Sequence, residues 1–472
     1  MIGPALLLAV IVLPFAMALA CVWLDGVRAQ RLSTLAVLVL GMLSWLAVVD
    51  VEFTLFAGRA LRMSPIGQLG VQLLSLAMLG WVLALQRVGE AERRHWLPAS
   101  WLSLAGLVLA MLVNTLPLAL LAFVGAGMLW ALGLTPERRR ASSGAALRYS
   151  ALLALAIPML LPAYRLAEQR TVSTPELERI VLALAVPGFA LLLGLIPLHA
   201  WTLSVASGAP REMLLGVVGV VQTAGFMLLL RTFEQHPWLT AQAGAPLILG
   251  GALSALLGGW LAVSARRADP DDWLVYAMVA HSGMMMVGLG TQSRAAAVGV
   301  TLMLFARALA VVLLAVSPRT RGLPRRVAVT AATLALAGTP GLAGFPGLWL
   351  VLRRLLETGD ELPPLPGKPL VPLALLAGSG LLFATALRRW RIPQAGMDAV
   401  RIGGVADAAK TAGLERAAGD RTLALAPTEG DATRARQMVW LLVILLLAAG
   451  LAPQLLAEPF GRALERMFFL LD

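Results

Sequence analysis

The sequence predicts an all-α polytopic membrane protein. Of its 472 residues, 59% are hydrophobic and only 14% carry a formal charge, and the mean hydropathy is +0.82. A soluble globular domain is about 45–50% apolar and about 25% charged. Long apolar segments recur along the chain, and two of them contain Pro and Gly residues in their middles. These observations exclude a soluble enzyme, a disordered chain and a disulfide scaffold.

A membrane-spanning helix needs about 20 apolar residues, because the hydrocarbon core is about 30 Å thick and each helical residue rises about 1.5 Å. We therefore predict about 14 transmembrane helices. The first is too long for the core of a signal peptide and lacks a basic start, so we expect it to be retained. The predicted spans are 2–24, 32–51, 66–86, 97–114, 117–134, 147–164, 180–204, 213–231, 246–265, 273–291, 295–316, 327–354, 369–387 and 437–457.

The basic residues predict the orientation of these spans, because short cytoplasmic loops are enriched in Lys and Arg. Loops after odd-numbered spans hold 25 of the 38 Lys and Arg residues, whereas loops after even-numbered spans hold 10. We therefore expect a multi-pass protein of the bacterial inner membrane with both termini outside. The net charge of +12 then reflects topology and lipid headgroups. The sequence has no basic face with interleaved aromatic residues, so nothing in it indicates nucleic-acid binding.

The seventh and twelfth spans contain helix breakers. The seventh contains Pro187 and, further on, Pro197, and the twelfth contains Pro340, Gly341 and Gly344. Proline removes a backbone donor and clashes with the preceding turn, so we expect both spans to be interrupted. Interrupted helices at equivalent places in two halves indicate an ion or substrate path near the bilayer midplane. The alternative is that these prolines merely kink two helices.

The two broken spans lie five helices apart, which favours two repeats of five helices each. An odd number of helices requires the second copy to be inverted relative to the first. The predicted organisation is then helices 1–3 in 1–96, the first repeat (helices 4–8) in 97–231, the second repeat (helices 9–13) in 246–387, a cytoplasmic loop in 388–436, and the last span with an interfacial tail in 437–472. The loop mixes both charge signs, so it is either a linker or a docking surface for a cytoplasmic partner.

Charged residues at the ends of the predicted spans, such as Asp50 and Arg231, are counted with the loops, and the titratable or charged side chains in the span interiors are then limited to His199, His281 and Arg307. Histidine has a reference pKa of about 6.5 and can relay protons, whereas arginine stays charged. Each histidine is either a relay or a structural hydrogen-bonding group; His199 could bind the carbonyls freed by Pro197. Arg307 is either a fixed charge that repels cations or attracts an anion, or a tie between helices through carbonyl groups, including those of the broken helices. Gln222 could orient water but cannot carry charge.

Three segments carry a resemblance to a known family. The run from Pro197 to Trp201, followed by Ala209-Pro210, resembles the "PLHxW…AP" segment of the antiporter-like proton-translocating membrane subunits. The run from Ala280 to Gly283 resembles that family's "HMG" region, and the run from Leu336 to Phe345 resembles its "LAGLPPLAGF" segment. The family includes membrane-arm subunits of complex I (NADH:quinone oxidoreductase), multisubunit cation/proton antiporters, membrane-bound hydrogenases and inorganic-carbon uptake complexes.

The resemblance implies a line of buried Lys, Glu and His residues that moves protons, and this chain departs from that pattern. Val124 stands where a fifth-span Glu is expected, and Leu192 where a seventh-span Lys is expected. Gln222 replaces an eighth-span Lys, and the eleventh-span "HALxK" reads Arg307 to Val311. The twelfth-span Lys is missing near Gly347 to Trp349. We therefore identify the chain as a divergent member whose relay residues are degenerate.

The sequence thus predicts an antiporter-like subunit of a complex-I-related assembly, nominally translocating protons or ions together with other membrane and cytoplasmic subunits. The alternatives are a proton-coupled inorganic-carbon or anion transporter subunit, and a non-conducting membrane scaffold for a cytoplasmic enzyme. We predict no cofactor and no metal site, since the single cysteine, Cys21, permits no Cys-based cluster and no nucleotide-binding glycine motif is present. Any redox chemistry would then belong to partner subunits.

Overall fold

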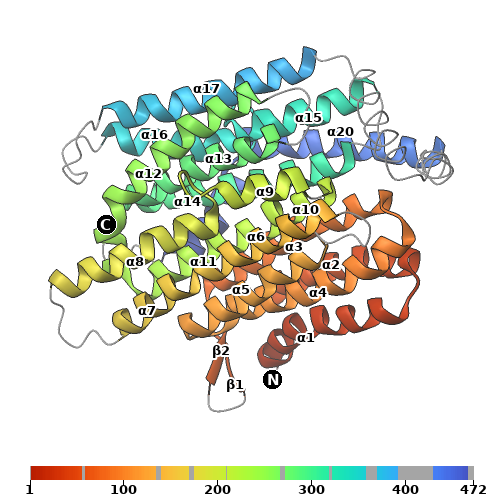
Figure 1. The fold of residues 1–472 in the computed structure, drawn as a ribbon, viewed down its shortest axis with the longest axis horizontal. Coiled ribbons are helices and arrows are strands. Elements are labelled where there is room, and N and C mark those ends of the chain that lie inside the picture. Colours follow the sequence, from red (N-terminus) through yellow and green to blue (C-terminus); the bar gives the residue numbers. More distant parts are fainter. Residues whose placement is uncertain are drawn as a thin grey trace.

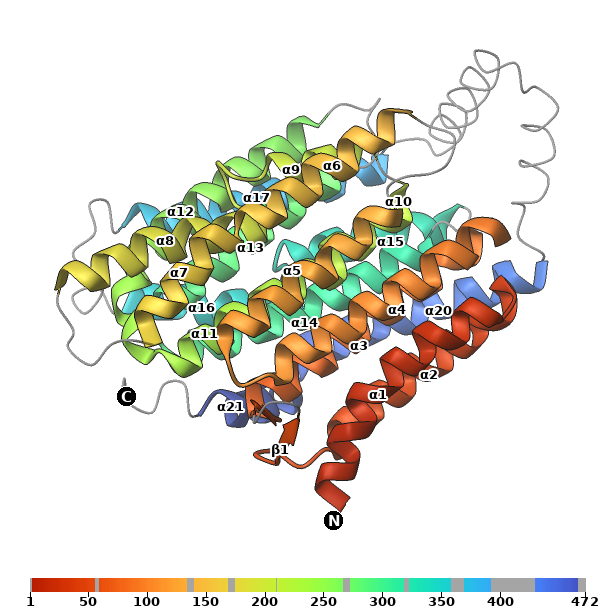
Figure 2. The ribbon, with the colours of Figure 1, turned by 60° about the horizontal axis from the view of Figure 1, so that its bottom comes forward.

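The computed structural model describes residues 2–55, 59–133, 140–168, 175–208, 210–265, 272–317, 322–357, 369–391 and 429–465. Helices dominate these residues and run side by side in one bundle (Figure 1). Two views agree that α1 (Ile2–Trp23) and α2 (Gly26–Leu46) lie at one edge, while α12 (Pro237–Ser264) and α17 (Leu370–Arg391) lie at the opposite edge (Figures 1 and 2). The prediction of an all-α membrane fold is confirmed, apart from one short hairpin.

Eleven helical segments among the described residues are long and apolar enough to cross a membrane. Besides the helices already named, six long helices in the described part of the chain are continuous. They are α3 (Pro65–Ala84), α4 (Glu90–Leu112), α5 (Leu116–Gly133), α13 (Asp272–Gly290), α14 (Arg294–Val316) and α20 (Glu429–Leu451). A short 3₁₀ turn, η2 (Leu85–Arg87), follows α3. The expected number of 14 spans stays a prediction.

The remaining spans are built from shorter pieces. They are α6 (Arg140–Leu155) with α7 (Ile157–Glu168), α8 (Pro175–Leu193) with α9 (Ala200–Gly208), α10 (Arg211–Gly216) with the π turn η3 (Val217–Val221) and α11 (Gln222–Gln235), and α15 (Leu323–Leu336) with α16 (Gly344–Glu357). The expected breaks at Pro197 and Pro340 are present. Pro187, in contrast, lies inside a continuous α8. Neighbouring helices satisfy the freed backbone groups in membrane proteins, so a proline inside a span need not end it.

A two-stranded antiparallel hairpin joins α2 to α3, which the sequence analysis treated as a plain loop. β1 (Glu52–Leu55) pairs with β2 (Arg59–Arg62), with Glu52 opposite Arg62. Arg62 closes the base of the hairpin through a 2.9 Å ion pair with Asp50. We call the end of the bundle that carries this hairpin the hairpin end; the C-termini of α2 and α4 lie there, since Leu61 forms a β-bridge with Val113.

The centre of the bundle is formed by α11, α13 and α14, whose apolar windows are at least 94% buried by other parts of the chain. Small residues allow close helix contacts, as is usual in membrane proteins. On α12, a methyl group at Gly251 would lie 2.7 Å from the Gly283 carbonyl oxygen of α13. Exposed apolar side chains lie instead on peripheral helices, such as Leu19 and Leu35 on α1 and α2 and Leu373 on α17.

The C-terminal part differs from the prediction at its boundaries. The predicted loop 388–436 is shorter, because Arg388, Arg389 and Arg391 belong to the last turn of α17 and α20 begins at Glu429; its middle, 392–428, lies outside the described residues. The predicted interfacial tail contains one helix, α21 (Gln454–Leu464). The rest of the tail after residue 465 lies outside the described residues.

Candidate functional site

The first helix break lies between α8 and α9. Gly194 follows the last residue of α8 and adopts a left-handed conformation with φ of +64°. Its N–H donates to the Leu191 carbonyl at 3.2 Å, and the N–H of Leu195 donates to the Ala190 carbonyl at 2.9 Å. A bond from the second residue after the helix back to a carbonyl five positions earlier is the Schellman cap, which favours glycine at its left-handed position. The chain then passes through Pro197 and restarts as a helix at Ala200.

The second break, between α15 and α16, has the same cap. Gly338 has a φ of +68°, and its N–H donates to the Ala335 carbonyl at 3.2 Å. The N–H of Thr339 donates to the Leu334 carbonyl at 3.1 Å, again five residues back. Pro340 and Gly341 follow in the break. This correspondence is what two related halves would produce, although the repeats themselves stay a prediction.

Gly344 begins α16, and its lack of a side chain is required there. A methyl group at this position would collide with the Ala335 carbonyl oxygen at the end of α15. On the other side of the break, Ser379 of α17 donates to the Ala337 carbonyl at 2.6 Å. A methyl group at Gly450 of α20 would lie 2.5 Å from the Gly341 carbonyl oxygen. The second break is therefore in contact with α17 and α20.

The carbonyls freed by the first break are bound by side chains from elsewhere. The Trp201 indole donates to the Leu191 carbonyl at 2.8 Å, and the Gln222 amide of α11 donates to the Leu193 carbonyl at 3.2 Å. The N–H of Ile196 donates to the Ser254 hydroxyl of α12 at 3.1 Å. Backbone groups inside a bilayer must be satisfied within the protein. Gln222 is therefore part of the structure that supports the break.

His199 lies in the break itself and is half-buried. Its ring centroid lies 6.3 Å from that of Tyr276 on α13, and its buried Nδ1 has no hydrogen-bond partner among the described residues. The carbonyls of Leu191 and Leu193 are bound by other side chains, so the structural alternative for His199 stays a prediction. The role of His199 as a relay stays a prediction.

Arg307 lies on α14 at the centre of the bundle and is fully buried. Its Nε and Nη2 donate to the Val218 carbonyl at 3.2 and 3.0 Å, and its Nη1 donates to the Ser282 hydroxyl at 2.8 Å. Nη2 also donates to the Gln222 side-chain oxygen. The interpretation of Arg307 as a tie between helices through carbonyl groups therefore agrees with the structure. The expectation that the broken helices supply those carbonyls is wrong, because the acceptor belongs to the π turn.

The π turn at Val217–Val221 explains why that acceptor is present. Here the N–H of Gln222 donates to the Val217 carbonyl five residues earlier, whereas an α-helix would use a carbonyl four residues earlier. The wider turn leaves the Val218 carbonyl for the arginine. Gly219 allows the turn to approach α14, since a methyl group there would lie 2.9 Å from Val311.

A continuous set of hydrogen bonds thus runs from the first break to the centre. It leads from the Leu193 carbonyl through Gln222 and Arg307 to Ser282, and so connects α8, α11, α14 and α13. His281 is the neighbour of Ser282 on α13 and is fully buried. Among the described residues, neither of its ring nitrogens has a hydrogen-bond partner. The candidate residues Gln222, Arg307 and His281 are therefore gathered at one place, with His199 at the adjoining break.

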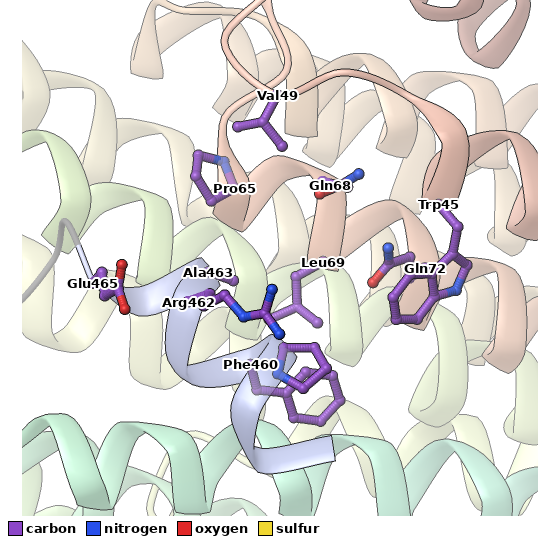
Figure 3. A pocket seen from close by; sticks show the side chains of 11 residues that line it. Trp45, Val49, Pro65, Gln68, Leu69, Gln72, Phe460, Arg462, Ala463 and Glu465 are labelled. Carbon is purple, nitrogen blue, oxygen red and sulfur yellow. The ribbon is translucent and has the colours of Figure 1, made fainter. Parts of the chain in front are cut away.

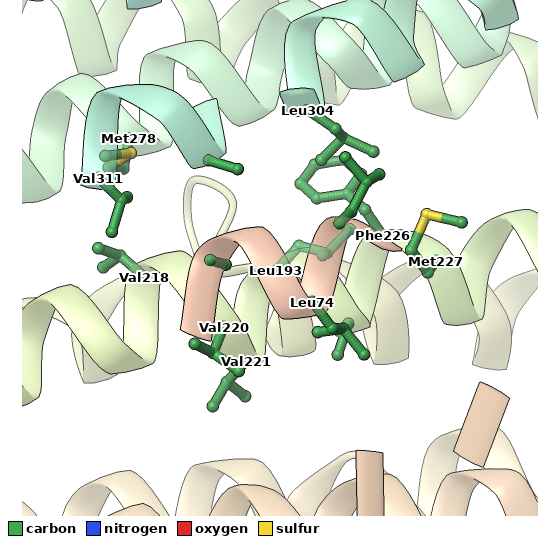
Figure 4. Close-up of a cluster of buried hydrophobic side chains, with 14 of the residues drawn as sticks. Leu74, Leu193, Val218, Val220, Val221, Phe226, Met227, Met278, Leu304 and Val311 are labelled. Carbon is green, nitrogen blue, oxygen red and sulfur yellow. The ribbon is translucent and has the colours of Figure 1, made fainter. Parts of the chain in front are cut away.

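The positions where the resemblance implies Lys or Glu are packed with apolar side chains. Val124, Leu192 and Val311 are each at most 1% exposed. Figure 4 shows Val218, Val311 and Leu193 in one cluster of buried hydrophobic side chains. Such a centre can hold the fixed charge of Arg307, but it offers no exchangeable carboxylate or amine at these positions.

The sequence analysis missed a second buried arginine. Arg231 was counted with the loops, yet it lies within α11 and is only 2% exposed. Its guanidinium donates to the carbonyls of Ala110 and Val113, the latter at 2.7 Å, at the C-terminal end of α4. Cations are favoured at that end of a helix by the helix dipole. Because Arg231 stands at the edge of an apolar run, hydropathy alone could not distinguish it from a loop residue.

No group of three or more His, Cys, Asp or Glu residues able to hold a metal ion exists within the part of the chain that the structure describes. Arg307 is also an unsuitable anion ligand in this arrangement, because every nitrogen of its guanidinium is already bonded to Val218, Ser282 or Gln222. The arrangement can provide a permanent positive charge, and the hydrogen bonds of the guanidinium connect three helices.

Comparison with known proteins gives a consistent picture. Residues 146–322 match the transmembrane family described as NADH:quinone oxidoreductase/Mrp antiporter. The NADH-quinone oxidoreductase subunit N of Beutenbergia cavernae is 30% identical over 40% of this chain and 36% of its own length. The NADH-quinone oxidoreductase subunit 14 of Thermus thermophilus is 29% identical over 66% of this chain and 82% of its own length. Among the first relatives of this kind, the chain spans only about a fifth to a third of their length.

Solved structures share the fold. A chain of respiratory complex I from Thermus thermophilus superposes with a TM-score of 0.70 at 23% identity, covering 96% of this chain and 98% of that one. A chain of the Mrp complex from a Dietzia species has a TM-score of 0.75 at 18% identity, covering 97% of this chain and 52% of that one. Both similarities extend well beyond the region that the sequence match covers.

Proposed function

We propose that the chain, which is similar to antiporter-like membrane subunits, serves as such a subunit in a complex-I-related assembly of the bacterial inner membrane. In this proposal the chain couples and supports partner subunits, and its own centre conducts few or no protons. The redox chemistry of the assembly lies in those partners. Both termini lie outside, as the loop charges predict.

The observation that carries this proposal is the hydrogen-bonded centre formed by Arg307, Gln222 and Ser282. A proton relay needs groups that gain and lose protons near neutral pH. An arginine keeps its proton, and a glutamine side chain has no titratable proton to pass on. Because Arg307 is bonded to two neighbouring helices, its charge is also fixed in place. The centre therefore favours a supporting role over conduction.

Anion transport through Arg307 receives no support from this geometry. A substrate anion would have to displace the Val218 carbonyl, the Ser282 hydroxyl or the Gln222 amide from the guanidinium. Each displaced acceptor would then be buried without a partner, at a cost of about 1–3 kcal/mol. The alternative function, a non-conducting membrane scaffold, is compatible with the proposal, since both assign the chain a supporting role.

Two measurements test the proposal together. The first is affinity purification of the tagged chain from its own host in mild detergent, followed by mass spectrometry of the intact complex. We expect other membrane and cytoplasmic subunits to co-purify. The second is proton flux through the purified chain in liposomes carrying a pH-sensitive dye, with protein-free liposomes as the control. We expect flux at the level of that control.

A chain that always purifies alone would contradict assembly into a complex. Pumping or ion exchange by the isolated chain, with a pH dependence near neutrality, would contradict the non-conducting centre. The two results are separable, because a chain could join a complex and still conduct.

A further inference from the structure

A groove lies between α21 and the outer sides of α2 and α3, at the hairpin end of the bundle. Two cavities of about 500 and 330 Å³ form it, and they share the wall residues Trp45, Leu69, Gln72 and Phe460. The smaller cavity continues along α3 as far as Leu79 and is lined almost entirely by apolar side chains. The larger cavity is open at the hairpin end and is lined by polar side chains as well.

The small side chains in this region create the space. Gly41 of α2 faces Ser75 of α3, and a methyl group added to Gly41 would meet only the Ser75 Cβ, at 3.7 Å. Both residues line the smaller cavity. At the other wall, the amphipathic α21 turns Phe460 inward, where its ring lies 6.3 Å from that of Phe305 on α14.

The length of the groove corresponds to one leaflet of the membrane. It extends along α3 from Pro65 to Leu79. At 1.5 Å per residue this is about 21 Å. A bilayer including its headgroup regions is about 40–45 Å thick, so a single leaflet occupies about half of that. A bound lipid would therefore fill the groove from the headgroup region to the middle of the membrane.

The polar groups are concentrated at the open end. Figure 3 shows Arg462 of α21 extending over the groove beside Phe460 and Leu69, with Gln72 and Trp45 on the facing wall. Gln72 is half-buried, and no hydrogen-bond partner for its amide is found among the described residues. An amide in an apolar wall needs a partner from a ligand or the solvent. Glu465 is paired with Arg294 at 2.8 Å, and Arg462 makes only a long, exposed ion pair of 3.7 Å with Glu458, so Arg462 is the cation at the mouth.

We propose that this groove binds one phospholipid, with an acyl chain between α2 and α3, the ester region at Gln72 and Trp45, and the phosphate at Arg462. The combination of an apolar slot, a facing amide and an interfacial arginine matches the three chemical zones of a phospholipid. An isoprenoid quinone would use the apolar slot but offers no anion for Arg462. The proposal does not depend on whether the chain conducts protons.

Native mass spectrometry of the purified chain, in the assembly in which it purifies, tests the proposal. The protein is delipidated in detergent and titrated with dioleoyl phosphatidylglycerol. We expect one molecule to be retained after mild activation. Gly41→Leu would fill the slot. We expect it to lower retention of the lipid by about tenfold, because the acyl chain would lose its apolar packing against α2 and α3. Arg462→Gln would lower retention by about fivefold, because one surface cation is removed.

Two matched variants serve as controls. Gly380→Leu places the same side chain on an exposed face of α17, where an added Cβ meets no atom within 4 Å. Arg353→Gln removes an exposed arginine of α16 that pairs with Glu357. Both should retain the lipid as the unmodified protein does. Melting temperatures of all four variants show whether each is folded.

Equal retention by Gly41→Leu and Gly380→Leu would overturn the proposal, as would retention of an endogenous quinone in place of the phospholipid. A partner subunit that cross-links to a photoreactive residue introduced at Trp45 would also overturn it, because a protein would then occupy the groove.

Discussion

Arg307 keeps a full positive charge at the centre of the bundle, where most neighbouring side chains are apolar. A charge at the centre of a membrane costs about 2.5–3.5 kcal/mol on insertion scales. Three acceptors on two other helices compensate: the Val218 carbonyl, the Gln222 amide and the Ser282 hydroxyl. The planar guanidinium can reach all three at once, which a lysine ammonium cannot.

Arg307→Lys should therefore destabilise the protein although the charge is conserved. At least one buried acceptor would lose its donor, which lowers the free energy of unfolding by about 1–3 kcal/mol. Thermal unfolding in detergent, followed by intrinsic fluorescence, measures the effect. Arg353→Lys on the exposed face of α16 is the control and should melt as the unmodified protein does. Identical melting of both variants would show that the three contacts are not required.

Substitutions of the adjacent residues His281 and Ser282 should affect stability differently. Ser282→Ala removes an acceptor of Arg307 and should lower the free energy of unfolding by about 1–2 kcal/mol. His281→Leu removes ring nitrogens that have no hydrogen-bond partner among the described residues, so stability should be unchanged or higher. Thermal unfolding checks both variants. If His281→Leu instead lowered proton flux in the assembled complex, His281 would act as a relay.

The sequence sufficed to identify Arg307, His281 and Gln222 as polar residues within the central spans, because hydropathy isolates them. It could not identify their partners. Whether Arg307 meets a carbonyl of the π turn or of a broken helix depends on the packing of η3 against α14, and no local pattern encodes that packing. Arg231 was misplaced for a similar reason, since its burial comes from contact with the end of α4.

At the level of the helices, the two breaks are built alike. Each uses a left-handed glycine, Gly194 or Gly338, in the same pattern of backbone hydrogen bonds. Prolines and glycines made both breaks predictable, because they remove a donor or permit positive φ. The hairpin at Glu52–Arg62 and the π turn contain no proline and only one glycine each, Gly58 and Gly219, so their sequences carry a weaker signal. Pro187 of the same span lies inside a continuous α8, since a proline within a helix can be accommodated by neighbouring helices.

Gly338→Ala should be more damaging than Gly341→Ala. Both positions have positive φ, so each alanine costs about 1–2 kcal/mol in backbone strain. At Gly338 the new Cβ would also lie 2.6 Å from Leu348, whereas at Gly341 it meets no atom within 4 Å. Comparing the melting temperatures of the two variants isolates the packing contribution. A lower melting temperature for Gly341→Ala would contradict the assignment.

At the level of the whole molecule, the loop charges predict which end of the bundle faces the cytoplasm. Arg28 and Glu52 lie at opposite ends of α2, and their side chains are 79% and 55% exposed. Cys21 is buried, so the unmodified chain offers little background for thiol labelling. In intact spheroplasts, Glu52→Cys should react with a membrane-impermeant maleimide, whereas Arg28→Cys should react only after permeabilisation. The reverse pattern would invert the proposed orientation.

The π turn at Val217–Val221 holds one residue more than an α-helix of the same length would need. At 3.6 residues per turn, one residue is a rotation of about 100°. The two halves of this span are therefore out of phase, and the direction in which Gln222 points depends on a single inserted residue. Deleting one codon from the valine run would restore the phase, turn Gln222 away from Arg307 and leave the guanidinium without its amide acceptor.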